Sequence, residues 1–144
     1  MQRVILPVKK DGKVIYWQGR GFDPGRPKAV NPAANREGLV AKYGDGDWVA
    51  LTEDILSAAK VGSVGEAWAL LGTVLSYSTA LTLAEAGRPV LLMLDDDPAG
   101  RRGAAEASKT LNLLGVWNKQ VYFGKDPKGV DRSTIKAKAK ELLP

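Results

Sequence analysis

Acidic side chains follow two apolar runs of this chain, where each run would end as a buried strand. Glu53 comes shortly after one run, and Asp95, Asp96 and Asp97 come directly after the other. Asp95 and Asp97 share a side of an extended chain, whereas Asp96 points away. Carboxylates crowded together repel one another unless some are protonated or a cation binds. The pattern therefore predicts a site for a divalent cation or for proton transfer.

The chain contains no cysteine and no histidine. This excludes disulfides, thiol nucleophiles, an imidazole base and zinc sites built from Cys or His. A metal site would need oxygen ligands throughout, and Mg²⁺, Mn²⁺ or Ca²⁺ would be the candidate ions. The carboxylates are therefore the candidate reactive centre.

Each acidic residue also has a simpler interpretation. Asp97 stands before Pro98, which is typical of an N-cap followed by proline in the first helical turn. Glu53 could favour a helix N-terminus through the helix dipole. Three adjacent aspartates exceed what one cap requires, so the joint pattern favours a functional site.

The 144 residues are enough for one compact unit. From residue 47 onward, apolar runs alternate with helical patterns, which is typical of a parallel α/β sheet. Strands are expected at 48–51, 67–71, 90–94 and 120–123, and helices at 55–62, 79–86, 100–114 and 135–142. Because ligands bind at the carboxyl ends of parallel strands, Glu53, Asp95 and Asp97 would converge there if their strands are neighbours.

Residues 1–46 are expected to form a small basic subdomain that precedes an α/β domain at 47–144. Two apolar runs, 4–8 and 14–18, flank an Asp-Gly turn and predict a β-hairpin. Residues 19–46 are rich in Gly, Pro and Asn and predict irregular structure around a short helix near 36–43.

The formal net charge of +5 is unevenly distributed. Residues 1–44 carry nine basic and three acidic side chains (+6), residues 45–100 carry two and nine (−7), and residues 101–144 carry ten and four (+6). Chance patterning of solvated charges is one explanation. The other is a polyanionic partner held by the basic flanks, with a cation between that partner and the acidic centre.

The acidic motifs resemble the signature of the Toprim family, which occurs in primases, topoisomerases and related nucleases. That signature places a glutamate after one strand and Asp-x-Asp after a later strand, as in residues 49–58 (VALTEDILSA) and 94–100 (LDDDPAG). Residues 70–73 (LLGT) and 124–127 (GKDP) are similar to further motifs of the family. Residues 3–8, 12–20 and 27–32 resemble the segment that precedes the Toprim domain in phage-type primases. The resemblance implies a Toprim-like, Rossmann-type parallel sheet flanked by helices.

The resemblance also implies a nucleotidyl transferase of primase type that synthesises RNA primers on single-stranded DNA with Mg²⁺ or Mn²⁺. Asp95 and Asp97 would be metal ligands, joined by Asp126 or by the nearby Asp131. Glu53 would be a further ligand or a general acid or base, so the implied catalytic residues are Glu53, Asp95 and Asp97. The alternatives are a Toprim-type nuclease and a module that binds nucleic acid without catalysis.

The expected partners are single-stranded DNA and nucleotides, contacted by basic residues. These candidates are Arg3, Arg20, Lys28, Arg101 and Lys125. No zinc is expected in this chain, so template recognition would depend on a zinc-binding module on another chain or would proceed without one. A replicative helicase is a further expected partner. No membrane-spanning segment is expected, and the expected location is the cytoplasm of a bacterial or phage-infected cell.

Overall fold

The computed structural model describes residues 3–21, 29–30 and 38–144. Residue contacts divide the chain into two compact units, Met1–Arg36 and Glu37–Pro144. The sequence suggests a boundary after residue 46 instead. The two boundaries differ because strand β4 (Ala41–Gly44) pairs with a strand of the second unit.

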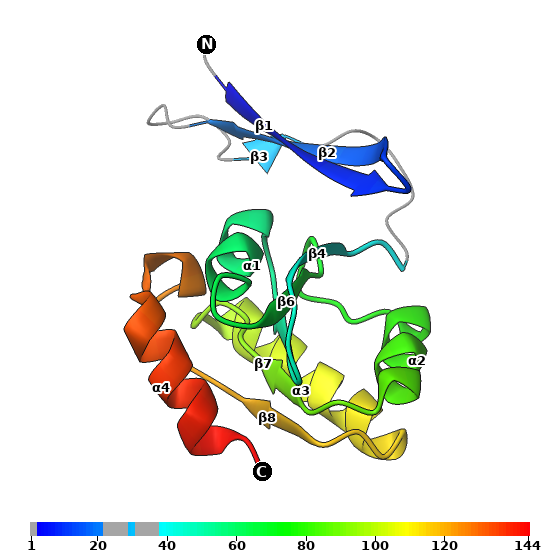
Figure 1. Ribbon diagram of the computed structural model, residues 1–144, viewed down its shortest axis with the longest axis vertical. Helices are drawn as coiled ribbons and strands as arrows, with labels where there is room; N and C mark the ends of the chain where they lie inside the picture. The colour runs from blue at the N-terminus through cyan, green and yellow to red at the C-terminus, as the bar shows by residue number, and fades with distance from the viewer. Residues whose placement is uncertain (1–2, 22–28, 31–37) are drawn as a thin grey trace. The chain divides into compact units, whose positions relative to one another are not determined.

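The described part of the first unit is an antiparallel sheet (Figure 1). Strand β1 (Arg3–Lys10) pairs with β2 (Lys13–Gly21), and β2 pairs with the short β3 (Ala29–Val30). Asp11 and Gly12 connect β1 to β2 with positive φ angles of 52° and 78°, as a two-residue hairpin turn requires. The hairpin predicted from the Asp-Gly turn is therefore confirmed.

The second unit is built on a five-stranded sheet with the order β4-β6-β5-β7-β8. Four strands run parallel: β5 (Val49–Thr52), β6 (Glu66–Ala69), β7 (Val90–Leu92) and β8 (Asn118–Gln120). Strand β4 adds an antiparallel edge. Every residue of β5 and β7 is buried, as expected of strands covered on both faces. The predicted α/β fold is confirmed, with one edge strand more than expected.

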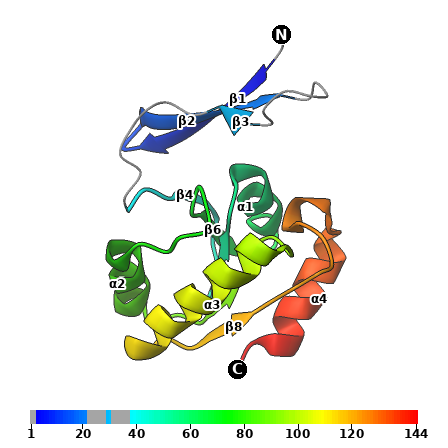
Figure 2. The ribbon, with the colours of Figure 1, turned by 180° about the vertical axis from the view of Figure 1, so that it is seen from behind.

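Four α-helices cover the sheet, two on each face (Figures 1 and 2). One face carries α2 (Tyr77–Ala86) and α3 (Pro98–Leu113), and the other carries α1 (Ile55–Val61) and α4 (Arg132–Leu142). Leu51 and Leu92 of the sheet join Leu83 of α2 and Leu111 of α3 in one apolar core. Among the helices that the structure describes, none is long and apolar enough to cross a membrane.

The helix expected near 36–43 is wrong where the structure describes it, because residues 41–44 form β4. Buried and more exposed side chains alternate along this segment, which is the period of a strand. Ala41 is buried opposite Ala69, and the Lys42 ammonium lies 4.1 Å from the ring centroid of Trp68. Pairing with β6 thus outweighs local helix propensity. The part of the expected helix before residue 38 lies outside the described residues.

The last strand also differs from the expected one. Strand β8 ends at Gln120, whereas the apolar run at 121–123 predicts a strand through residue 123. Val121 is buried and donates its N–H to the Leu92 carbonyl at 2.9 Å. The apolar run therefore anchors the loop that leaves the sheet and leads to Asp126.

Gly44 provides a test of how β4 joins the second unit. It has a φ of 70°, and a Cβ atom there would overlap the carbonyl oxygens of Gly62 and Gly65. We expect Gly44→Ala to lower the free energy of unfolding by about 2–3 kcal/mol. The control is Gly87→Ala at a similar φ of 66° with no atom within 4 Å, where we expect a loss of about 1 kcal/mol. Equal losses in urea unfolding would contradict the role of the close approach.

Candidate functional site

The candidate site lies where β5 and β7 end side by side. Leu51 pairs with Leu92 across these neighbouring parallel strands, and the Met93 N–H donates to the Leu51 carbonyl at 2.8 Å. The residues that follow meet directly, because the Asp95 N–H donates to Oε1 of Glu53 at 3.2 Å. The structure therefore brings together two acidic residues that lie 42 positions apart in the sequence.

Helix α3 begins directly beside this acidic pair. A Cβ atom on Gly100 would overlap the Asp95 carbonyl oxygen and would lie 2.8 Å from Oε1 of Glu53. Glycine therefore allows the first turn of α3 to approach the two carboxylates closely. The N-terminus of a helix carries a partial positive charge, so this approach favours the ionised forms of the carboxylates.

Asp95 has a carboxylate oxygen without a hydrogen bond from the described part of the chain. Its Oδ1 atom is buried and has no hydrogen-bond partner among the described residues. Burial, together with the negative charge of Asp126 and against a lowering by Lys128, raises the pKa of Asp95 to about 6. An unpaired carboxylate oxygen in such surroundings is costly, so it is available to a proton or a cation.

The carboxyl group of Glu53 is also strongly perturbed. Burial, joined by the negative charges of Asp95, Asp97 and Asp126, raises the pKa of Glu53 to about 7. The hydrogen bond from the Asp95 N–H opposes this shift. A carboxyl group with a pKa near neutrality can exchange a proton at physiological pH.

Asp97 and Asp126 lie near this pair but do not close around it. Asp97 is exposed and caps α3, since its Oδ1 accepts the Gly100 N–H at 2.7 Å. Asp126 precedes the short 3₁₀ helix η1 (Pro127–Gly129), whereas Asp131 is exposed at the N-cap position of α4. Within the described ranges, no three acidic side chains converge closely enough to form a preformed metal site.

A lysine that the sequence analysis did not single out lies among these acids. Lys128 Nζ lies 2.8 Å from Oδ2 of Asp54 and 2.9 Å from Oδ2 of Asp126. Asp54 caps α1 by accepting the Ser57 N–H at 2.7 Å. Aspartate is a typical residue at a helix start, so this role could have been expected from the sequence. No local pattern could have paired Asp54 with Lys128, which follows it by 74 residues.

The sequence model of the Toprim-like family matches residues 52–131 of this chain. This match begins just before Glu53 and includes Asp95, Asp97 and Asp126. The chain belongs to the Toprim-like family. The resemblance stated from the acidic motifs is confirmed, and the matched residues include strands β6, β7 and β8 and helices α1, α2 and α3.

This Toprim-like chain is also similar to known primases. It is 30% identical over 159 aligned residues to the DNA primase of Aquifex aeolicus (strain VF5), which covers 99% of this chain and 31% of that protein. The crystal structure of the zinc-binding and RNA polymerase domains of Aquifex aeolicus primase matches with a TM-score of 0.67 at 27% identity, over 97% of this chain and 37% of that one. The structure of the DnaG primase catalytic domain bound to single-stranded DNA matches with a TM-score of 0.78 at 23% identity, over 99% and 52%. The Toprim-like chain thus spans between about a third and about half of these relatives.

Asp96 has a structural role in the Toprim-like domain. It accepts hydrogen bonds from Arg101 Nε at 2.7 Å and from the Gly124 N–H at 2.9 Å. The Arg101 guanidinium also pairs with Asp96 through Nη2 and lies 4.2 Å from the ring centroid of Tyr122. Arg101, a candidate for nucleic-acid binding, therefore has partners within the domain that account for its position.

The other basic candidates lie in several parts of the chain. Arg3 and Arg20 lie on β1 and β2 of the first unit, opposite Gly21 and Val4 respectively. Lys125 is exposed in the loop that leads to Asp126. Lys28 lies outside the described residues. Their contacts with nucleic acid stay predictions.

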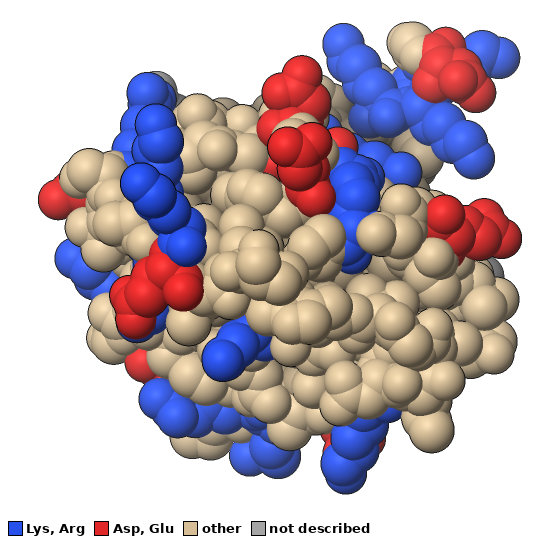
Figure 3. All heavy atoms as spheres, turned by 60° about the horizontal axis from the view of Figure 1, so that its bottom comes forward, with Lys and Arg blue, Asp and Glu red and all other residues tan. Residues whose placement is uncertain are grey.

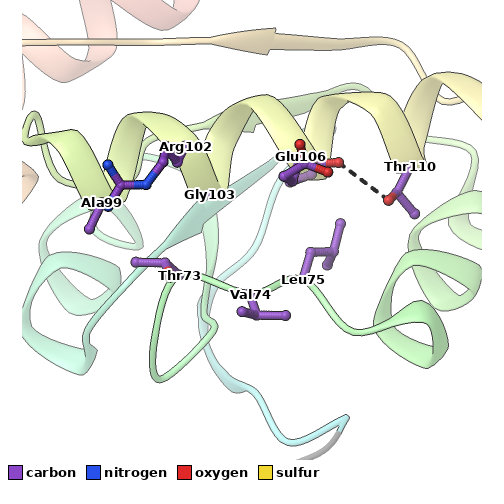
Figure 4. Close-up of a pocket in the computed structure, with 9 residues that line it drawn as sticks. Thr73, Val74, Leu75, Ala99, Arg102, Gly103, Glu106 and Thr110 are labelled. Atoms are coloured by element: carbon purple, nitrogen blue, oxygen red, sulfur yellow. Dashed lines mark hydrogen bonds between the residues drawn. The ribbon is translucent and has the colours of Figure 1, made fainter.

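A hollow of about 340 Å³ lies between α3 and the loop after β6 (Figure 4). Its lining mixes apolar and polar side chains: Thr73, Val74, Leu75, Ala99, Arg102, Gly103, Glu106, Ala107 and Thr110. Ala99 lies two residues after Asp97, so the hollow begins at the same helix turn as the acidic motif.

Charged residues also stand at the starts of the strands. Asp47 lies two residues before β5, and Glu66 begins β6 and pairs with Arg88 at 2.8 Å. Figure 3 shows the face at the bottom of Figure 1, where side chains of both charges lie among larger areas of other residues.

The raised pKa values predict how stability depends on pH in metal-free protein. The native state binds protons on Glu53 and Asp95 more tightly than the unfolded chain does, so stability present below about pH 4 is lost as the pH rises through about 6 and 7. We expect Glu53→Gln, which keeps an oxygen for the Asp95 N–H, to lessen this loss by about 1–2 kcal/mol after allowance for solvent screening. Urea unfolding in EDTA at several pH values measures the effect.

The matched control for this experiment is Glu85→Gln, which removes the same charge from an exposed position on α2. It should leave the pH dependence of unfolding as in wild type. An unchanged slope in Glu53→Gln would show that Glu53 does not titrate in this range.

Proposed function

We propose that this chain is the catalytic part of a primase-type nucleotidyl transferase, which joins ribonucleotides into RNA primers on single-stranded DNA. The observation that carries the proposal is the direct contact of Glu53 with Asp95 at the ends of neighbouring parallel strands. The similarity to a DNA primase over 99% of the chain supports it. Because the chain spans only part of that relative, further domains would contribute to the complete reaction.

The chemistry of the acidic residues suits a hard divalent cation, which would draw them together from the more open arrangement of the described side chains. Asp95, Asp97 and Asp126 would hold Mg²⁺ or Mn²⁺, with Glu53 beside them, because these ions prefer carboxylate oxygens. The unpaired Oδ1 of Asp95 and the mutual repulsion of the carboxylates support this assignment. When bound, the ion would neutralise charge on the phosphate oxygens of the incoming nucleotide.

Glu53 would accept the proton that the attacking 3′-hydroxyl releases. In primer extension a 3′-hydroxyl oxygen attacks the α-phosphorus of a nucleoside triphosphate, and pyrophosphate leaves. One Glu53 oxygen is held by the Asp95 N–H, which orients the carboxylate to accept the hydroxyl proton with the other. A pKa raised toward neutrality by burial suits this exchange.

Basic side chains would hold the phosphates of the template and the nucleotide. Lys125 is exposed and adjoins Asp126, so it is suited to contact the triphosphate. Arg3, Arg20 and Lys28 would contact the template, whereas Arg101 would keep its structural pairing with Asp96. A zinc-binding module, like the domain in the Aquifex aeolicus primase structure, and a replicative helicase would act with the chain in the cytoplasm of a bacterial or phage-infected cell.

Extension of an RNA primer already annealed to single-stranded DNA tests the proposal without a template-recognition module. With labelled ribonucleotides and Mg²⁺ or Mn²⁺, we expect the wild type to lengthen the primer. Asp95→Asn should lower the rate on the order of 100-fold or more, because it removes a charge from the reacting centre. The control Glu85→Gln should retain the wild-type rate.

The other outcomes of this assay identify other functions. Metal-dependent degradation of either strand without extension would indicate a Toprim-type nuclease. Binding of single-stranded DNA that survives both EDTA and Asp95→Asn, with no chemistry, would indicate a binding module. Either result would overturn the proposed primer synthesis.

The same assay decides which acid completes the site. Asp126 influences the carboxyl groups of both Glu53 and Asp95, whereas Asp131 is exposed at the start of α4. We expect Asp126→Asn to slow primer extension at least about tenfold and Asp131→Asn to change it by less than about twofold. Asparagine is itself a good N-cap residue, so the start of α4 should remain intact. A reversed order of effects would assign the role to Asp131.

A further inference from the structure

We infer that the positive charge of Lys128 opposes the binding of a divalent ion at the acidic site. Its ammonium group pairs with Asp54 and Asp126, which lowers the affinity for an ion that binds beside Glu53 and Asp95. This inference rests on the proposed metal-dependent function. It assigns a regulatory role to a lysine that would neither coordinate the metal nor touch the substrate. Lys128 would act on the bound ion through its charge and through its pairing with Asp54 and Asp126.

The contacts of Lys128 are those of a bridging charge. Its ammonium group bonds a carboxylate oxygen of Asp54 at 2.8 Å and one of Asp126 at 2.9 Å. The three side chains are partly shielded from solvent, with exposed fractions of 27% for Lys128, 14% for Asp54 and 42% for Asp126. Charge-assisted hydrogen bonds in such surroundings are stronger than those of exposed pairs. Each of these two carboxylates is therefore already paired with a positive charge.

The backbone around Lys128 is held independently of its charge. Pro127 is buried, and the Lys128 N–H donates to Oγ of the buried Ser57 at 3.3 Å. The Gly129 N–H donates to the Asp126 carbonyl at 2.9 Å. A neutral side chain at position 128 should therefore leave η1 in place and change mainly the electrostatics of the site.

Removing the lysine charge should favour a divalent ion for two reasons. The repulsion between the ammonium and the ion disappears, and the negative charges of Asp54 and Asp126 are no longer offset by a neighbouring positive charge. Both effects act over short distances in partly desolvated surroundings, so they combine to about a tenfold gain in affinity. A purely structural lysine would give no such gain.

Binding of Mn²⁺ alone, followed by electron paramagnetic resonance, tests the inference without an activity assay. We expect Lys128→Gln and Lys128→Met to bind Mn²⁺ about tenfold more tightly than the wild type. Lys128→Arg, which keeps the charge, should bind like the wild type. Lys136→Gln is the matched control, because it removes the same charge from an exposed position on α4.

Equal or weaker Mn²⁺ binding by the neutral variants would overturn the inference. Circular dichroism checks that each variant is folded, and loss of the fold in both Gln and Met variants would identify Lys128 as a structural tether and overturn the inference as well. If the wild type binds Mn²⁺ and the neutral variants bind no more tightly, the proposed function stands without this role for Lys128. If no protein binds Mn²⁺, the metal-dependent function fails too.

Discussion

Repulsion between carboxylates at the ends of β5 and β7 is the constraint that the second unit must accommodate. Several acids are stabilised locally: Asp54 and Asp97 accept backbone N–H groups at the starts of α1 and α3, and Asp96 pairs with Arg101. Glu53 and Asp95 have weaker compensation, and burial raises the pKa values of both. Two carboxylates of a crowded set are thus left incompletely compensated.

Local patterns in the sequence predict most of the parts that build the site. Continuous apolar runs mark β5 and β7 because both strands are buried on both faces, and parallel strands bring Glu53 and Asp95 to one edge. The strand β4 escapes prediction because its pairing with β6 depends on a partner distant in sequence. The bridge from Lys128 to Asp54 escapes for the same reason, since 74 residues separate them and neither residue has a periodic signal.

Some residues of the acidic motif serve two purposes at once. Asp97 caps α3 as its position before Pro98 suggests, yet its charge also acts on Glu53 and Asp95. Capping and chemistry are therefore not competing explanations for this residue. The same holds for Asp126, which is held by Lys128 and still influences both members of the acidic pair. Structural anchoring keeps these charges where they can act on the site.

The pairing of Asp96 has a consequence for the conformational entropy of the site. Asp96 belongs to the turn that joins β7 to α3, and its bond to the Gly124 N–H ties that turn to the loop carrying Lys125 and Asp126. This hydrogen bond links two segments that lie 28 residues apart in the sequence. Part of the entropy that would be lost on collecting Asp95, Asp97 and Asp126 around a ligand is already lost on folding. The pairing of Asp96 would thereby make assembly of the site around a ligand less costly.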